Sequence, residues 1–589
     1  MCGIISYKGQ QPAPKIILAG LKKLEYRGYD SWGIAVKDQE INLLKKIGKV
    51  GEIEAKDLDF KSQGDQIAIG HSRWATTGKV TEANAHPHLS NNKKIALVQN
   101  GIVENYLTLK KELQAKGYIF NSETDTEVIV NLIQEYNRKN DFVQAVRKAF
   151  NRLTGRNAIV AIHQDNNLIV GARLGSPLIV GIGDNEYFLA SDIPAFLNYT
   201  RRVNYLDDGE LVVIDQSPRF FSLKTGQEIL KRLIEIDWQA DQAEKGDYRH
   251  FMIKEIMEQK ETIRRAVEQD EKAILKIARD IKNAFGTFLV GAGTAGKVCF
   301  TGDYFFSKIA GEHTNFVPAS EFINYSHFLT PKSLMVVVSQ SGETADVLEA
   351  MEIAKAKGVK IISLVNVQGS SIMRQSDYSL LIKAGPEQAV ASTKATTAQM
   401  SILALLAYAI NDQLARGKTN LVALAGKVND MLNPRYEDHI RQLAEKIHKH
   451  ESMYIIGRGV NYPMALECAI KLQEVSYIHA EGFAGGELKH GPIALIGEGT
   501  PLITLVANDE NRESILSNAQ EVKSRGGYII GVSPFPSDVF DYWIKVPEVG
   551  PLSPIVNIIP VQILAYHLGV LKGNDPDKPR NLAKSVTVK

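Results

Sequence analysis

The chain has 589 residues, of which 44% are hydrophobic and 23% charged, and its formal net charge is +2. This length and balance are typical of a soluble protein of three or four domains. A net charge near zero gives no electrostatic reason to expect nucleic acid or an anionic membrane as a partner. No run of eighteen apolar residues occurs, and no basic segment leads into an apolar one at the start of the chain. We therefore expect no membrane span and a cytoplasmic location.

Only three cysteines occur, Cys2, Cys299 and Cys468, and their spacing gives no disulfide framework. The chain begins MCGIISYKG, so removal of Met1 would leave Cys2 with both a thiol and a free α-amine. A nucleophile and a base would then share one residue. The alternative is a small apolar side chain at the start of a buried strand.

The first 235 residues contain short strand-like pieces and a few helices. Apolar spacing predicts a helix over 14–28, and strands are expected at 166–172 and 210–215. Residues 237–249 are polar and lack apolar periodicity, which indicates a linker, and a charged helix is expected over 254–269.

The second half contains an internal repeat. Apolar strands begin at Phe288, Leu334 and Lys360, at intervals of 46 and 26 residues, and again at Met453, Pro501 and Tyr528, at intervals of 48 and 27. A turn and a helix-length pattern follow these strands, which predicts two tandem doubly wound domains with parallel sheets. Ligands of such sheets bind beyond the carboxyl ends of the strands.

One such strand end carries a cluster of hydroxyl groups. The segment SQSGETAD follows the strand at 334–338 and contains Ser339, Gln340, Ser341 and Thr344. Hydroxyls near a helix start favour a phosphate site, and the absence of a following lysine excludes a Walker loop, so a sugar phosphate fits better than a nucleotide. The alternative is a helix cap rich in Ser and Thr.

Charged residues gather at three further places. Lys471 and Glu474 share one helix face at i,i+3, and a glycine-rich turn carries Glu487, Lys489 and His490. The alternative for both groups is a solvated charged surface. The tail ends in NLAKSVTVK, where Lys584 is available for imine chemistry.

Three segments of the first domain contain candidate site residues. Arg73 is suited to an α-carboxylate, Asp125 to an α-ammonium, and Asn100 with Gly101 to an oxyanion. The histidines His71, His86 and His88 have no cysteine partner, so we expect no metal.

Taken as a whole, the sequence resembles the glutamine–fructose-6-phosphate aminotransferase (isomerizing) family. The segments that carry the resemblance are MCGI, LEYRGYDS, HSRWAT, NAHPH, NGIVEN, SETDTEV, SQSGETAD, VASTKA, GELKHGP and PRNLAKSVTV. The resemblance implies an α/β and α+β fold: an N-terminal-nucleophile glutaminase sandwich followed by two tandem doubly wound sugar-isomerase (SIS) domains. It implies a glutaminase domain at 2–237, a linker and helix at 238–280, SIS domains at 281–425 and 440–579, and an active-site tail at 580–589. The expected reaction converts fructose 6-phosphate and glutamine to glucosamine 6-phosphate and glutamate, with no cofactor and no metal.

The resemblance also implies roles for individual residues. Cys2 would attack the glutamine amide, Trp74 would gate ammonia, and Lys584 would form an imine with the open-chain ketose. Glu474 would move a proton between C1 and C2, with Lys471 one helical turn before it, and His490 would open the ring from the partner subunit of a homodimer. The remaining residues would bind glutamine (Arg73, Thr76, Gly101, Asp125), form the oxyanion hole (Asn100, Gly101) or hold the sugar phosphate (Thr294, Ser339, Gln340, Ser341, Thr344, Ser392).

The sequence departs from the family pattern at four positions: Thr77, Gln99, Ala295 and Thr396. Ala295 stands where a phosphate-binding serine is common, so one hydroxyl is expected to be missing. These departures leave open a specialised enzyme that aminates another ketose phosphate. A sugar-phosphate-binding regulator is the alternative outside enzymes, although it would have no need of Cys2, Glu474, His490 and Lys584 together.

Overall fold

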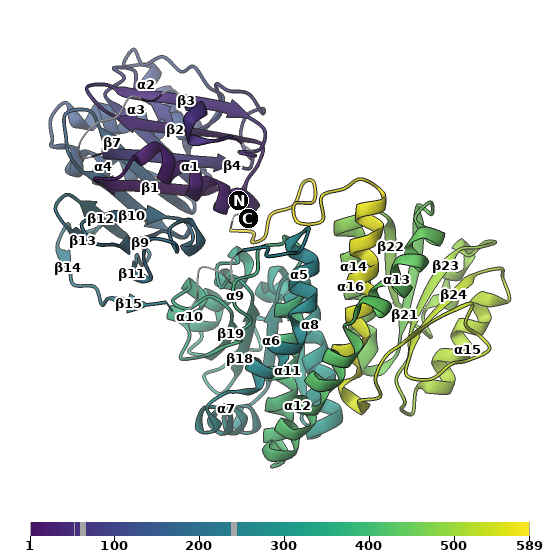
Figure 1. The fold of residues 1–589 in the computed structure, drawn as a ribbon. Helices are drawn as coiled ribbons and strands as arrows, with labels where there is room; N and C mark the ends of the chain where they lie inside the picture. The colour runs from purple at the N-terminus through teal and green to yellow at the C-terminus, as the bar shows by residue number, and fades with distance from the viewer. Residues whose placement is uncertain (1, 52, 59, 61–65, 237–243, 588–589) are drawn as a thin grey trace. The chain divides into compact units, whose positions relative to one another are not determined.

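The computed structural model describes residues 2–51, 53–58, 60, 66–236 and 244–587. It divides into two compact units, Met1–Ala243 with Ala583–Lys589, and Glu244–Leu582 (Figure 1). Each unit has its own sheets and its own hydrophobic core.

Two antiparallel sheets make up most of the first unit. The eight-stranded sheet has the order β15 (Ile234–Glu235), β11 (Arg202–Tyr205), β9 (Ile179–Ile182), β10 (Tyr187–Ala190), β1 (Gly3–Gly9), β4 (Gln66–Arg73), β2 (Ser31–Lys37), β3 (Ile41–Ile47). The seven-stranded sheet has the order β14 (Glu228–Ile229), β13 (Pro218–Ser222), β12 (Glu210–Ile214), β8 (Ile169–Leu174), β7 (Asn157–His163), β6 (Ile95–Gly101), β5 (His88–Leu89).

Successive apolar side chains of β1 point to opposite faces of the eight-stranded sheet, and both faces are buried. Ile4 packs in the core between the two sheets, with Ile69 and Val98, whereas Ile5 packs with Ile17 of α1 on the other face. A period of two directs successive side chains to opposite faces of a strand, so an apolar run is needed wherever both faces are covered.

Helices cover the outer faces of this sandwich. The helix α1 (Ala13–Leu24) packs on the eight-stranded sheet, and a short 3₁₀ turn, η1 (Glu25–Arg27), follows it. The helices α2 (Tyr106–Gln114), α3 (Thr126–Asn137) and α4 (Phe142–Phe150) share a core with β6, β7 and β8. The predicted helix at 14–28 and the two predicted strands are confirmed as α1 with η1, β8 and β12.

Two five-stranded parallel sheets form the second unit. Their orders are β17 (Thr314–Pro318), β16 (Thr287–Gly291), β18 (Leu334–Ser339), β19 (Lys360–Val365), β20 (Tyr378–Leu381), and β22 (His479–Ala484), β21 (Ser452–Gly457), β23 (Pro501–Leu505), β24 (Tyr528–Ser533), β25 (Tyr542–Lys545). Both orders read 2-1-3-4-5 within their own copy, so the predicted repeat and its parallel sheets are confirmed. This order places a switch point between the first and third strands of each sheet, where doubly wound proteins bind ligands.

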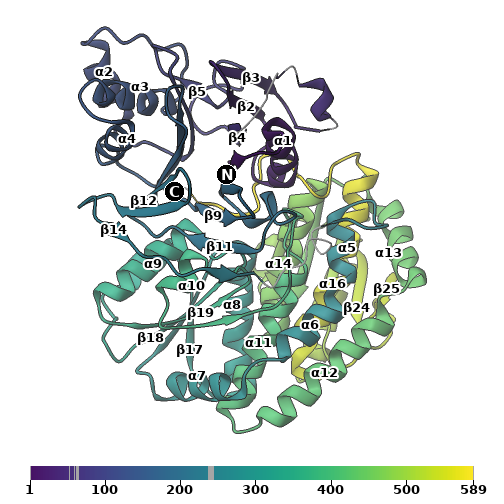
Figure 2. The same cartoon turned by 60° about the vertical axis from the view of Figure 1, so that its left-hand side comes forward.

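Helices flank both sheets, as Figure 2 shows for α8, α9 and α10 around the first. They are α5 (Phe251–Met257), α6 (Gln259–Val267), α7 (Glu271–Asn283), α8 (Gly293–Phe305), α9 (Ala345–Ala356), α10 (Ser371–Gln375), α11 (Lys394–Ile410), α12 (Leu414–Met431), α13 (Pro434–Ile447), α14 (Tyr462–Ser476), α15 (Arg512–Lys523) and α16 (Ser553–Leu571). The helix expected over 254–269 is interrupted at Glu258, so it forms α5 and α6 instead. The helices α8 and α14 follow the first strand of their respective sheets and pack on each other.

Within the described part of the chain, one segment, Gly550–Leu571, is long and apolar enough to span a membrane by length and composition. Of its most apolar window, 89% is buried inside the protein, where α16 packs against α13 and α14. Its apolar character on all sides therefore reflects a position in the core of the second unit.

Replacing Leu289 with alanine is expected to destabilise the second unit selectively. Leu289 lies in β16 and is completely buried, so its loss removes apolar contacts and leaves a cavity that costs about 2–5 kcal/mol. Chemical denaturation monitored by hydrogen exchange should show earlier unfolding of peptides from 244–582, with little change in those from 66–236. The control is Leu230→Ala, because Leu230 is 96% exposed. Equal stability of the two variants would contradict the core described here.

Candidate active sites

Cys2 lies at the N-terminal end of β1, an interior strand of the eight-stranded sheet. Cys2 immediately precedes β1, and the antiparallel pairing of Gly3 with Ser72 of β4 brings Trp74 beside it. The Trp74 N–H donates to Cys2 Sγ at 3.3 Å, and the thiol lies 3.5 Å from the Trp74 carbonyl oxygen. Burial raises the pKa of the Cys2 thiol, and the Trp74 N–H and the guanidinium groups of Arg73 and Arg27 act in the opposite direction.

Two buried side chains hold the backbone of Cys2. Asn100 Nδ2 donates to the Cys2 carbonyl oxygen at 3.0 Å, and Arg27 Nε donates to the same oxygen at 3.2 Å. Arg27 is itself fixed by an ion pair of 2.8 Å with Asp192. The side-chain amide of Asn100, near the end of β6, is therefore held next to Cys2.

Gly101 has to be glycine for two geometric reasons. Its φ of +115° lies in the region that L side chains rarely adopt, and a Cβ there would lie 1.9 Å from the Arg156 carbonyl oxygen. This requirement leaves the backbone next to Asn100 uncovered by any side chain of residue 101.

Arg73, the last residue of β4, and Asp125, which directly precedes α3, line the same cavity as Cys2. The cavity is also lined by Trp74, Thr76 and Gly101, so six of the predicted residues share it. Asp125 Oδ2 accepts a hydrogen bond of 2.7 Å from the Val103 N–H, and burial raises the pKa of this carboxyl. A cation and a carboxylate facing one thiol can orient an amino acid by its two charged groups.

The Arg73 guanidinium also organises the loop that follows β4. Its Nη2 donates to the carbonyl oxygens of Thr77 and Gly78 at 2.5 and 3.1 Å, and its Nη1 donates to that of Lys79 at 3.2 Å. A ligand carboxylate on Arg73 would therefore be coupled to the conformation of residues 77–79.

Three buried imidazoles form a layer behind this cavity. The rings of His71 and His86 stack with centroids 4.1 Å apart, and His88 meets His86 edge-on at 4.9 Å. His71 Nε2 lies 3.0 Å from the Gln99 carbonyl oxygen and 3.2 Å from Asn100 Oδ1, so this nitrogen carries the proton and donates to both. Burial lowers the pKa of His71 to about 3, which keeps the ring neutral.

The other two imidazoles reach the turn that carries Asp125. His86 Nε2 lies 3.1 Å from the Thr126 hydroxyl, and His88 Nε2 lies 3.1 Å from the Thr124 hydroxyl. The Gln99 side chain joins the same network through Thr126 and Asn157. The sequence singled these histidines out only as unconvincing metal ligands, whereas their hydrogen bonds connect the oxyanion-hole candidate Asn100 with the turn around Asp125.

In the second unit a buried ionic cluster joins α8 to α14. Lys471 Nζ lies 2.5 Å from Glu474 Oε2, 3.4 Å from Glu467 Oε1 and 3.2 Å from the Thr294 hydroxyl. The Thr294 hydroxyl in turn donates to Glu467 at 2.9 Å. The cluster lies at the carboxyl end of β16, beside the switch point of the first sheet.

Burial and charge act against each other in this cluster. Burial raises the pKa of Glu467 to about 7, although the Lys471 ammonium opposes the shift. Burial alone would lower the pKa of Lys471, but the carboxylates of Glu474 and Glu467 outweigh it and hold the pKa above its usual value. Lys471 therefore stays charged and acts as a hydrogen-bond donor. Glu467 was missed from the sequence, although its i,i+4 spacing to Lys471 places both on one face of α14.

The predicted hydroxyl cluster lies in the loop between β18 and α9. Ser339 and Thr344 share a hydrogen bond of 3.1 Å, and the Ser339 hydroxyl accepts one of 3.0 Å from the Gly342 N–H. The Ser341 hydroxyl accepts from the Glu343 N–H at 3.2 Å. These bonds close the loop around the N-terminus of α9, where free N–H groups favour an anion.

The remaining predicted residues lie at three places. Ser392 donates to Glu387 at 3.1 Å, just before α11. His490 is exposed on a short 3₁₀ turn, and among the described residues of this chain its side chain has no hydrogen-bond partner. In the tail, the Arg580 N–H donates to the Tyr477 hydroxyl at 2.7 Å, and Lys584 belongs to the last residues, which group with the first unit.

Comparison with known proteins identifies a domain model in each half of the chain. A glutamine amidotransferase domain model matches residues 55–226, and an SIS domain model matches 281–409 and 446–571. Glutamine–fructose-6-phosphate aminotransferases (isomerizing) from Pyrococcus horikoshii and Thermus thermophilus are 43% and 42% identical over 602 and 608 residues, with both chains covered completely.

A solved structure also resembles the second half of the chain. The C-terminal domain of glucosamine-fructose-6-phosphate aminotransferase from Francisella tularensis is 35% identical, with a TM-score of 0.53, and covers 57% of this chain and 99% of its own. Full-length identity above 40%, together with both domain matches, shows that the chain is a member of the glutamine–fructose-6-phosphate aminotransferase (isomerizing) family.

Proposed function

We propose that the protein transfers the amide nitrogen of glutamine to fructose 6-phosphate, with glucosamine 6-phosphate and glutamate as products. The observation that carries this proposal is the presence of two sites on one chain. The first unit has a thiol near an amide and a guanidinium, and the second has both a buried acid–base cluster and a hydroxyl loop. Membership of the family supports the same reaction. The enzyme would act in the cytoplasm.

In the first unit Cys2 would release ammonia from glutamine. Once Met1 is removed, the α-amine takes the thiol proton and the sulfur attacks the amide carbon. Asn100 Nδ2 and the Gly101 N–H stabilise the oxyanion, and the α-ammonium returns its proton to the nitrogen as the C–N bond breaks, which releases ammonia. Water then hydrolyses the thioester to glutamate and restores the thiol. Arg73 would hold the α-carboxylate and Asp125 the α-ammonium, with Thr76 as a further contact.

In the second unit the phosphate would bind Ser339, Ser341 and Thr344. Thr294, Gln340 and Ser392 would make further contacts with the sugar phosphate.

Trp74 of the first unit would gate the passage of ammonia. Free ammonia in water at neutral pH is mostly ammonium, which is not a nucleophile, so its transfer has to exclude water.

Isomerisation needs a base at the sugar and an activated carbonyl. Lys584 would form the imine with the open-chain ketose, and Glu474 would carry the proton between C1 and C2. Lys471, held at 2.5 Å from Glu474, keeps this carboxylate oriented. We propose that His490 opens the sugar ring in the partner subunit of a homodimer, because its side chain is exposed on a glycine-rich turn.

A second candidate function is amination of another ketose phosphate, for which Ala295, Thr77 and Thr396 are the motivating residues. Thr396 is buried and its hydroxyl lies 3.4 Å from the Ser392 carbonyl oxygen. Product analysis with glutamine and a panel of ketose phosphates separates the two functions. Preference for fructose 6-phosphate supports the first, and preference for another ketose overturns it.

Cys2→Ala is expected to abolish glutamine hydrolysis and leave isomerisation of the ketose phosphate unchanged, because the two sites are built in different units. Intact-mass measurement of the active enzyme should show a chain that begins at Cys2. Retention of Met1 in active protein would rule out the α-amine as base. Loss of both reactions in the variant would contradict the division of chemistry between the units.

His71→Phe is expected to lower kcat for glutamine hydrolysis by up to about 100-fold with little change in KM, since it removes the donor that orients Asn100. In His71→Gln the side-chain amide can take the place of Nε2 and should restore most of the rate. Steady-state kinetics of both variants, with isomerisation as the internal control, distinguishes orientation from packing. If both variants lose activity and stability equally, His71 is a packing residue.

Lys584→Arg is expected to reduce amination by orders of magnitude while glutamine hydrolysis persists, because arginine keeps the charge but forms no imine. Borohydride treatment with fructose 6-phosphate should leave a stable adduct on Lys584 of the parent enzyme, located by peptide mass spectrometry. Lys578→Arg is the matched control in the same tail. Normal amination by Lys584→Arg, without an adduct in the parent, would refute the imine.

A further inference from the structure

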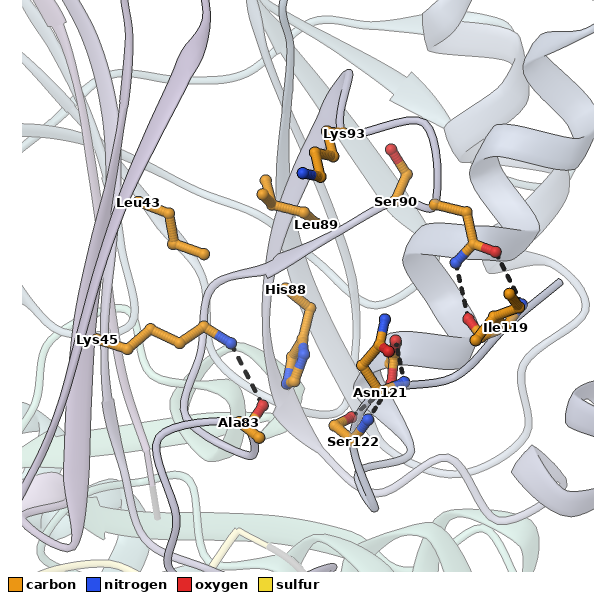
Figure 3. A pocket seen from close by; sticks show the side chains of 12 residues that line it. Leu43, Lys45, Ala83, His88, Leu89, Ser90, Lys93, Ile119, Asn121 and Ser122 are labelled. Carbon is orange, nitrogen blue, oxygen red and sulfur yellow. Dashed lines mark hydrogen bonds between the residues drawn. The ribbon is translucent and has the colours of Figure 1, made fainter.

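A second cavity of about 430 Å³ lies in the first unit, between β3, the His88–Leu89 strand and the segment at 119–122 (Figure 3). It shares no lining residue with the cavity at Cys2. Its volume is within the range of small-molecule sites, about 300–1,000 Å³. No step of the proposed reaction uses it.

A lysine points into this cavity from β3. Lys45 extends from its strand toward His88 (Figure 3), and its ammonium has one hydrogen bond, a long one of 3.4 Å to the Ala83 carbonyl oxygen. Within the described part of the chain, no carboxylate lies within ion-pairing distance of it. Burial lowers the pKa of Lys45 to about 8, against the attraction of Glu127. The structure thus keeps a cation partly out of water without a counter-ion.

The acidic residue at this cavity is already satisfied. Glu127 accepts hydrogen bonds from the Asn121 N–H at 2.9 Å and from the Ser122 N–H and hydroxyl, both at 2.7 Å. Its charge is therefore compensated by the backbone turn before α3. Lys93 adds a second positive charge at the rim.

Two leucines supply apolar lining near Lys45, alongside polar residues such as Asn121 and Ser122. Leu43 precedes Lys45 by two residues on the same face of β3, and Leu89 lies across from them (Figure 3). Such a surface accepts the body of a small molecule while the cation takes its charged group.

We propose that this cavity is a second small-molecule site, which binds a compound through a carboxylate or phosphate oxyanion on Lys45, with the remainder packed between Leu43 and Leu89. An oxyanion there would form the ion pair that Lys45 lacks. This proposal does not depend on the reaction catalysed at the other sites.

The two cavities are separated by a single layer of side chains. His88 lines the second cavity, and its Nε2 lies 3.1 Å from the hydroxyl of Thr124, which lines the cavity at Cys2. If Asp125 holds the α-ammonium of glutamine as proposed above, occupancy of the second cavity should change KM for glutamine more than kcat, because it acts on the turn that carries Asp125; the anion site itself does not depend on that role.

Trace reductive methylation of the full-length protein tests the site at Lys45 itself. At pH 8, Lys45 should react faster than its neighbour Lys46, which is exposed on the other face of β3. Inorganic phosphate or acetate should slow Lys45 saturably toward the rate of Lys46, with chloride at equal ionic strength as control. Protection by phosphate alone would identify a phosphate ligand, and protection by both anions a general oxyanion site. No saturable protection by either anion would overturn the proposal.

A matched pair of variants gives an independent measurement. Hydrogen exchange of peptides covering 83–93 and 119–127 should slow when phosphate or acetate is added to the parent protein and to Lys46→Gln. In Lys45→Gln this slowing should be lost, while exchange without added anion stays as in the parent. Equal slowing in both variants would place the anion elsewhere and refute the role of Lys45.

Discussion

The position of the first strand is the constraint on which the placement of Cys2 depends. The strand β1 lies between β4 and β10 and pairs with both, so its backbone hydrogen bonds are satisfied along its length. Cys2 is the last residue before this pairing starts, which places its thiol at the end of an interior strand of a rigid sheet. Arg27 and Asn100 then fix the carbonyl of Cys2 from two other elements. A chain terminus is ordinarily frayed, and here four separate segments hold it.

A second physical theme is the handling of buried polar groups. In the first unit the three imidazoles stay neutral, because burial lowers their pKa values, and a carbonyl or hydroxyl partner meets the Nε2 of each ring. In the second unit Lys471 stays charged, because two carboxylates surround it. Burying a charge without a partner costs several kcal/mol, so both arrangements follow from the same rule. The neutral network orients groups, whereas the charged one holds an acid and a base side by side.

Much of the architecture was predictable from the sequence, for identifiable reasons. The parallel sheets follow from apolar runs at repeated intervals, and the hydroxyl loop after β18 follows from its place at a strand end. The charged face of α14 was recognised only in part: Lys471 and Glu474 were identified, but Glu467 was not, since a third charge on a helix ordinarily indicates solvent. The position of Thr294 beside it depends on packing between two distant helices, which no local pattern encodes.

The network in the first unit was harder to foresee. His71 lies in β4, His88 lies in β5, and His86 lies in the segment between these strands. The contacts between their rings therefore depend on how the two sheets face each other. The helix break at Glu258 could not be predicted from the sequence, because no proline or glycine interrupts the helical pattern there. In the sequence, Lys45 likewise looks like any surface lysine of a basic strand, and only its burial in the structure distinguishes it from Lys46.

The packing of α8 on α14 has a consequence for the evolution and engineering of the fold. These helices occupy equivalent places in the two copies of the repeat, yet one supplies the hydroxyl and the other supplies both carboxylates and the ammonium. The copies have thus divided a single site between them, and neither half retains a complete set. A fragment that contained only the later copy would expose Lys471 and Glu467 without Thr294, and a shuffled domain would inherit only part of this buried cluster. The repeat is symmetric as a fold, but its buried ionic cluster needs both copies.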